Sequence, residues 1–401
     1  MRELREILAE WERRRDEPLA LATVVRTRGS AYRRPGARML IAGDGTTVGS
    51  VSGGCLETEV AEQASAVRAG DEPALLTFDT TDPSDILFGT GTGCRGVVDL
   101  LIEWVPPFEE DRLSSGDAVA ESSAFEPATG AVRPLNVLRF ASGLLRERNR
   151  GVVATIVSAP VGSGARPGDH LFLAEKDSEL RSEIDDPELG AAVAAAAREF
   201  LAGGASRLVS LASASGPVEV FLDRIEPPPS LIVFGAGYDA VPLVRLAEEL
   251  GYEVILVDHR AAFATPERFP QAEAIHVGRP AEVWDRLPLA PDTSVVILTH
   301  NYALDRELLE RLLPSPVSYI GLLGPALRKE QILEELRQEG LALTEETLSR
   351  LHAPIGLDLG ADTPETVALA ILAEMQAVRA GHSGGPLRER QGPIHSETGS
   401  S

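Results

Sequence analysis

A strand, a glycine-rich turn, a helix and a second strand follow one another in the second half of the chain, and this order restricts the fold more than any other feature. The apolar run Leu231–Phe234 is typical of a buried strand, and Gly235 and Gly237 follow it at once in a G-x-G-x-x-A turn. A second apolar run ends in Asp258, roughly 20 residues later. Such glycines let the backbone approach a pyrophosphate, and the terminal acid accepts hydrogen bonds from a ribose. The order therefore predicts a Rossmann-type dinucleotide-binding domain over residues 229–381.

The same domain places a histidine where a ligand is expected. The strand predicted at Ser294–Leu298 is followed by His300, and ligands of open α/β sheets bind outside the carboxyl ends of the strands. A histidine that hydrogen-bonds a strand end for structural reasons fits the position equally well. Asp258 favours NAD and the nearby Arg260 leaves NADP open, while a Rossmann fold with an idle site is the alternative.

The length of the chain and a run of three prolines indicate two domains. Its 401 residues suit two domains, and Pro227-Pro228-Pro229 is a stiff boundary between them. We predict an α/β protein: a mixed α/β domain over residues 1–226, a Rossmann-like doubly wound parallel sheet over 229–381, and a flexible tail over 382–401.

The first half contains a pattern that returns later. The segments Ala22–Val25, Arg34–Gly36 and Met39–Ile41 are echoed by Ala154–Val157, Arg166–Gly168 and Leu171–Leu173, and an alanine-rich helix is expected after each set. This pattern predicts an internal duplication of a strand–loop–strand–helix unit, with chance similarity as the alternative. The second copy has Asp186-Pro187-Glu188 where the first has Gly53-Gly54-Cys55, so we expect the chemistry in the first copy.

Charge narrows the choice of ligands. The net charge of −23 argues against nucleic acid and acidic membranes as partners. Residues 19–42, however, contain no acid and five arginines, among them Arg33 and Arg38, which predicts a pocket for an anion. The chain has no run approaching the ~20 apolar residues of a membrane helix, and it begins with a charged segment, so we expect a cytoplasmic protein.

Both cysteines lie in glycine-rich segments. Cys55 follows Gly53 and Gly54 at the expected start of a helix, a position that favours a thiolate, and Cys94 lies in the loop 91–96 beside an arginine. Either thiol is a candidate ligand for a soft metal, and a small buried apolar side chain is the alternative. The sequence contains no P-loop, H-E-x-x-H or G-x-S-x-G motif.

These motifs resemble those of one family, the accessory factors of xanthine dehydrogenase and carbon monoxide dehydrogenase known as XdhC/CoxI. The resemblance rests on segments at both ends of the chain: Gly29–Met39, Ser52–Glu57, Gly91–Cys94, Phe234–Ala240, Val257–Arg260, Thr299–Asn301, Tyr319–Arg328 and His352–Asp358. Two departures are Tyr238, where many members have histidine, and Arg95, where a small polar residue is usual.

The resemblance implies a chaperone that binds the molybdenum cofactor (molybdopterin), supports its sulfuration and passes it to a molybdenum hydroxylase, with a cysteine desulfurase as a further partner. It implies cofactor-binding roles for the arginine segment and the cysteine loops, with Cys55 and Cys94 as metal ligands. The competing hypotheses are an NAD(P)-dependent oxidoreductase that uses His300 as proton donor, and a scaffold that senses nucleotide without turnover. A homodimer is the expected assembly.

Overall fold

The computed structural model describes residues 2–29, 31–65, 67, 72–79, 96–107, 136–176 and 180–389. The chain forms two compact units, Glu3–Pro227 and Pro228–Ser401, with the division inside the run of three prolines. None of the described helices is long and apolar enough to cross a membrane.

The N-terminal unit contains two five-stranded sheets with the same strand order, β3-β2-β1-β5-β4 and β8-β7-β6-β10-β9. The elements of the first copy are α1 (Arg2–Arg13), β1 (Leu19–Gly29), β2 (Arg38–Ala42), β3 (Thr47–Gly49), α2 (Glu57–Ala64), β4 (Ala74–Asp79) and β5 (Gly96–Val105). Those of the second copy are α4 (Val137–Arg146), β6 (Gly151–Ser158), β7 (His170–Ala174), β8 (Leu180–Ser182), α5 (Pro187–Leu201), β9 (Arg207–Ser213) and β10 (Gly216–Ile225). The shared topology confirms the predicted duplication as a property of the fold.

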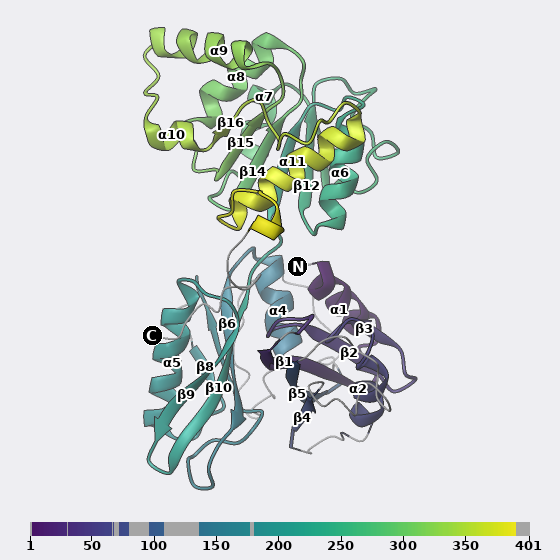
Figure 1. The fold of residues 1–401 in the computed structure, drawn as a ribbon, viewed down its shortest axis with the longest axis vertical. Coiled ribbons are helices and arrows are strands. Elements are labelled where there is room, and N and C mark those ends of the chain that lie inside the picture. The colour runs from purple at the N-terminus through teal and green to yellow at the C-terminus, as the bar shows by residue number, and fades with distance from the viewer. Residues whose placement is uncertain are drawn as a thin grey trace, which may run out of the picture. The chain divides into compact units, whose positions relative to one another are not determined.

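The apolar pattern of the strands explains why both faces of each sheet are covered. In β1, Ala20, Ala22 and Val24 pack with α2, and the alternate residues Leu19 and Leu21 enter a core shared with the second sheet. In the second copy α5 covers the outer face in the same way, and α1 and α4 both contribute to the shared core (Figure 1). The two copies therefore pack against each other through equivalent faces.

The C-terminal unit is a six-stranded parallel sheet of order β13-β12-β11-β14-β15-β16. Its elements are β11 (Ser230–Phe234), α6 (Ala240–Glu249), β12 (Glu253–Asp258), β13 (Ala274–Val277), α7 (Pro280–Val283), η1 (Trp284–Arg286), β14 (Thr293–Ile297), α8 (Tyr302–Leu312), β15 (Tyr319–Leu322), α9 (Ala326–Gln338), α10 (Glu345–Ser349), β16 (Leu351–His352), α11 (Pro364–Arg379) and η2 (Leu387–Glu389). This is the doubly wound order, and it confirms the predicted Rossmann-like fold.

Helices cover both faces of this sheet (Figure 1). Leu231 and Val233 of β11 pack with α6 and α11, whereas the alternate residues Ile232 and Phe234 pack with α8 and α9. A strand that is buried on both faces has consecutive apolar residues, and for this reason β11 could be predicted from the sequence. The pair Thr363-Pro364 also predicts the start of a helix, and α11 begins there, since the Thr363 hydroxyl oxygen accepts a hydrogen bond from the Thr366 N–H.

Several elements differ from the sequence expectations. The first strand continues past Val25 to Gly29, and β4, β9 and β10 were not predicted. The sequence also favours helices at 114–122 and 137–146; the second is present as α4, and the first lies outside the described residues.

Candidate functional site

The loop before α2 presents Cys55 in a compact hydrogen-bonded turn. The Ser52 hydroxyl oxygen accepts hydrogen bonds from the N–H groups of Gly54, Cys55 and Leu56 at 3.3, 3.2 and 3.1 Å. Glu57 accepts from the Ser50 and Ser52 hydroxyls at 2.7 and 2.5 Å. Because these groups satisfy the N–H groups that a helix start leaves open, the loop has a defined shape before any ligand arrives.

The carboxyl of Glu57 is ionised in this loop. Burial raises its pKa, but hydrogen bonds from Ser52, Ser50 and the backbone N–H groups outweigh burial and bring the pKa to about 2. Cys55 is half-buried, and its side chain packs at the edge of the apolar cluster formed by β1 and α2. The loop therefore holds one thiol beside a fixed negative charge and three engaged N–H groups.

The middle of the arginine segment (residues 19–42) lies against this loop. The Tyr32 ring covers Gly53, where an added Cβ would lie 3.3 Å from the ring, and the Tyr32 side chain remains 73% exposed. Arg33 pairs with Glu3, whose carboxylate also accepts from the Ser50 N–H at 3.4 Å. The structure thus brings the predicted residues Arg33, Gly53, Gly54 and Cys55 together on one surface.

Three other arginines of this segment have acidic partners elsewhere in the fold. Arg26 donates to Asp99 at 2.6 Å and to Glu219 at 3.2 Å, and Arg28 lies 3.6 Å from Asp99. Arg38 is 8% exposed and pairs with Asp223 of β10. The expectation of arginines without counter-charge is therefore wrong: the segment contains no acid, but distant strands supply the carboxylates.

Arg38 belongs to a pair of reciprocal contacts that sequence reasoning missed. Arg38 on β2 contacts Asp223 of the second copy, and His170, at the equivalent position of β7, contacts Glu103 of the first copy with Nε2 3.0 Å from the carboxylate. His170 also lies 3.1 Å from the Thr155 hydroxyl. These buried pairs join the two copies and place Arg38 inside the unit, away from the Cys55 surface.

The glycine turn of the C-terminal unit has the backbone shape that its sequence predicts. Gly235 has φ +112°, and an added Cβ would lie 2.4 Å from the carbonyl oxygen of Leu298. Its N–H donates to the Val257 carbonyl at 2.8 Å. Only glycine fits this conformation and this close approach between β11 and β14.

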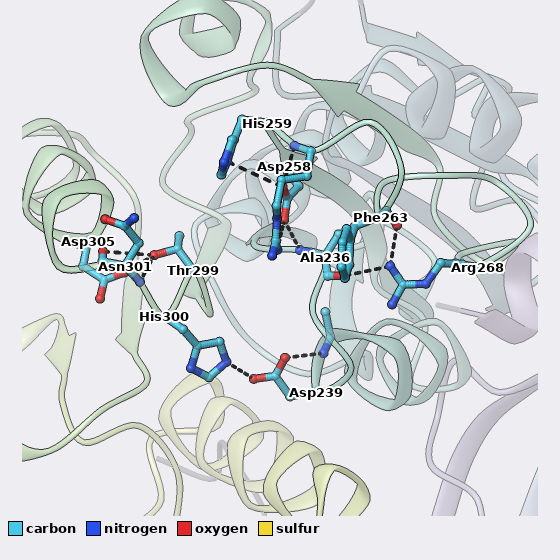
Figure 2. Close-up of polar contacts among 12 residues, drawn as sticks. Ala236, Asp239, Asp258, His259, Phe263, Arg268, Thr299, His300, Asn301 and Asp305 are labelled. Carbon is cyan, nitrogen blue, oxygen red and sulfur yellow. Dashed lines mark hydrogen bonds and ion pairs between the residues drawn. The ribbon is translucent and has the colours of Figure 1, made fainter.

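Asp258 ends β12 as predicted, and protein groups surround its carboxylate (Figure 2). It accepts from the Ala236 N–H at 2.7 Å, from the Arg260 N–H at 2.8 Å, and from the Arg260 guanidinium at 3.0 and 2.7 Å. Burial raises the pKa of Asp258, but the hydrogen bonds from Arg260 and Ala236 outweigh it and hold the pKa below the ordinary value. Arg260 in turn packs over Phe263, 4.4 Å from the ring centre.

His300 lies between the ends of β11 and β14. At this point the chain changes direction across the sheet, because β11 to β13 run toward one edge and β14 to β16 run toward the other. Its Nε2 is 2.7 Å from Oδ2 of Asp239, a residue that sequence reasoning did not single out (Figure 2). The backbone of His300 has φ +54°, which is uncommon for a residue other than glycine. Its side chain is 61% exposed, whereas that of Asp239 is 15% exposed.

A second carboxylate, that of Asp305, interacts electrostatically with His300 of this pair. Asp305 of α8 is 1% exposed, accepts from the Thr299 hydroxyl, and pairs with Arg328 of α9 at 2.8 Å. Burial raises the pKa of Asp305, and the contacts with Thr299 and Arg328 oppose that effect only in part. Arg328 thus joins α8 to α9 at the carboxyl edge of the sheet.

The fold family implies a dinucleotide here, and the residues present do not fit its pyrophosphate. The second glycine of such turns leaves space for the pyrophosphate, but an added Cβ at Gly237 would meet Oδ1 of Asp239 at 2.6 Å. The carboxylate expected to bind ribose, Asp258, is also saturated by Arg260 and backbone N–H groups. The protein's own side chains therefore fill both positions.

No resident metal site is visible in the described part of the chain, which contains no group of three histidine, cysteine or acidic side chains arranged around an ion. Cys94, the second predicted thiol ligand, lies outside the described residues.

Fold and site together define a class: a two-unit α/β protein with a duplicated N-terminal unit that presents a cysteine loop, followed by a Rossmann-type unit. Comparison with known families makes the assignment specific. Residues 12–79 match the XdhC and CoxI family, residues 231–375 match the XdhC Rossmann domain, and the two matches cover just over half of the chain. The chain belongs to the XdhC and CoxI family.

Individual relatives are similar to this chain over nearly all of its length. A probable xanthine dehydrogenase subunit from Bacillus subtilis (strain 168) is 29% identical over 370 residues, 90% of this chain and 94% of that protein. The molybdenum cofactor insertion chaperone PaoD of Escherichia coli (strain K12) is 23% identical over 360 residues, 90% and 83% of the two chains. A crystal structure described as a xanthine dehydrogenase from Bacillus halodurans superimposes with a TM-score of 0.71 at 25% identity, covering 96% of this chain and 98% of that one.

Proposed function

We propose that this protein is an accessory factor of molybdenum-cofactor maturation. It binds the cofactor as cargo, supports its sulfuration with a cysteine desulfurase as partner, and delivers it to a molybdenum hydroxylase such as a xanthine dehydrogenase. Family membership and the similarity to a protein named as a molybdenum cofactor insertion chaperone support this role.

The observation that carries the proposal is the asymmetry between the two copies of the N-terminal unit. In the second copy, Asp186 caps α5 with its own carboxylate, which accepts from the Leu189 N–H at 2.7 Å. In the first copy, Ser52 and Glu57 accept these hydrogen bonds instead, so that a thiol, Cys55, lies two residues before the first helical residue, Glu57. One scaffold thus has a purely structural helix start in one copy and a chemically distinct start in the other.

The surface around Cys55 has the chemistry that the cargo requires. A thiolate is a ligand for thiophilic molybdenum, and the Arg33 guanidinium suits charge-assisted hydrogen bonds to a phosphate, in exchange for its contact with Glu3. The exposed Tyr32 ring beside Gly53 offers a flat apolar surface for a pterin. These residues bind and orient cargo, and none of them is assigned a catalytic role.

Cofactor retention tests the proposal. Protein mixed with molybdenum cofactor is gel-filtered without oxygen, then assayed for molybdenum and for oxidised pterin fluorescence, beside Cys55→Ser and Cys94→Ser. We expect near-stoichiometric retention by the wild type and a loss of about tenfold or more in Cys55→Ser, with unchanged thermal unfolding.

The duplication supplies a matched control for the arginine. Arg166 occupies the equivalent loop of the second copy with 74% of its side chain exposed, so Arg166→Gln makes the same charge change in the copy whose helix start lacks the thiol. Arg33→Gln is expected to weaken retention, and Arg166→Gln is expected to leave it unchanged. Equal retention by wild type, Cys55→Ser and Arg33→Gln would count against this surface as the binding site.

A further inference from the structure

The space that a Rossmann turn reserves for a pyrophosphate is filled here by a carboxylate of the same turn. Oδ1 of Asp239 lies over Gly237, 2.6 Å from where a Cβ would stand, and accepts from the Ala240 N–H at 3.1 Å. A dinucleotide pyrophosphate would need the same space and the same first N–H groups of α6. Asp239 therefore competes with that ligand for both volume and hydrogen-bond donors.

The position of Asp239 is fixed from a second side. Its other oxygen, Oδ2, is 2.7 Å from Nε2 of His300, and the side chain is 15% exposed (Figure 2). Movement away from the turn would break the contact with His300 and the cap on α6. The negative charge thus stays in the crevice instead of turning out to solvent.

The nearby arginines do not offset this repulsion of a pyrophosphate, because they already donate to protein groups. The Arg260 guanidinium donates twice to Asp258, and Arg268 donates to the carbonyl oxygens of Ala236 and Phe263 at 3.0 and 2.8 Å. A pyrophosphate would therefore meet the Asp239 carboxylate at contact distance, without a cation free to compensate among these residues. Like charges at such a distance repel strongly in a partly buried site.

From this geometry we infer that Asp239 is a specificity-determining residue that excludes dinucleotides: its charge makes the Rossmann crevice reject the pyrophosphate of NAD and NADP. The unit keeps the fold of a dinucleotide-binding domain while its own Asp239–His300 pair occupies the crevice. The inference is independent of the proposed role in cofactor maturation.

Calorimetric titration of the full-length protein with NAD⁺, NADH and NADP⁺ tests this inference. The wild type is expected to show no saturable binding up to about 1 mM ligand. Asp239→Asn keeps the size and the cap on Ala240 but removes the charge, and we expect it to gain at least about tenfold in affinity for at least one of these ligands. Asp239→Ser is a second neutral variant with the same expectation, should the amide disturb the contact with His300.

Two control variants decide whether charge is the cause. Asp285→Asn removes the same charge from an exposed position of η1 and is expected to behave as the wild type. His300→Asn opens the pair but leaves Asp239 charged, so no gain is expected. Tight dinucleotide binding by the wild type, no gain in either Asp239 variant, or an equal gain in His300→Asn would each overturn the inference.

Discussion

His170 shows how one residue sets a pH dependence for the N-terminal unit. It is the only histidine among the first 227 residues, is 7% exposed, and contacts Glu103 of the other copy. Burial lowers its pKa, but the carboxylates of Glu103, Glu183 and Asp169 outweigh burial and leave the pKa above the ordinary value. The charged imidazole is therefore stabilised by folding.

This shift has a defined sign. Because the pKa is higher in the folded state, His170 contributes its full stabilisation below pH about 6.5, and the contribution is lost as the pH rises through the folded pKa. We expect the free energy of unfolding of the N-terminal unit to fall as the pH rises above about 6.5, measured by urea unfolding at a series of pH values. His170→Gln should be less stable at pH 6, on the order of 3 kcal/mol, and should lack this slope. An unchanged slope in the variant would contradict the assignment.

At the scale of elements, the turn between β11 and α6 depends on Gly235 twice over. An added methyl group would overlap the Leu298 carbonyl at 2.4 Å, and the backbone at φ +112° disfavours any residue with a Cβ. Gly235→Ala is expected to lower the free energy of unfolding of the C-terminal unit by about 3 kcal/mol or more, measured by denaturant unfolding.

A helix glycine provides the contrast. Gly190 lies within α5, and an added Cβ there would have no atom within 4 Å. Gly190→Ala is expected to stabilise its unit by about 0.5–1 kcal/mol, because alanine is the better helix former. Similar stability changes in the two variants would show that the turn at Gly235 tolerates a side chain.

The elements that were predictable from sequence are those with local signals. A continuous apolar run followed by glycines predicted β11 and its turn, and Thr363 before a proline predicted the start of α11. The unpredicted strand β9 has only partly buried and exposed residues, so its apolar pattern is weak. Such a strand is defined by its pairing with β10, which the local sequence does not encode.

The same distinction between local and distant signals applies to the candidate site. The surface around Cys55 was predictable because its residues are close in sequence, whereas Arg38 and Asp223 are separated by 185 positions. The glycine pattern around Gly237 gave no indication that Asp239 turns back over it, because the conformation of one side chain decides that contact. The sequence therefore predicted which residues lie together in a loop better than it predicted which groups those residues contact.

At the scale of the whole molecule, the chain has two sets of cores that share no residue. The apolar clusters of the N-terminal unit end at Ile225, and those of the C-terminal unit begin at Leu231. Within the first unit, the reciprocal pairs Arg38–Asp223 and His170–Glu103 link the two copies. Damage at that junction should therefore remain confined to one unit.

Asp223→Ala tests this separation, because it leaves the Arg38 charge buried and unpaired. We expect the free energy of unfolding of the N-terminal unit to fall by about 3–5 kcal/mol, with the transition of the C-terminal unit unmoved in differential scanning calorimetry. The double variant Arg38→Met with Asp223→Leu replaces the pair by apolar groups and should recover most of the loss, since a well-packed apolar replacement of a buried ion pair is often neutral. If both transitions shifted together, the two units would unfold as one, and the Asp223 pair would contribute to the stability of the whole chain.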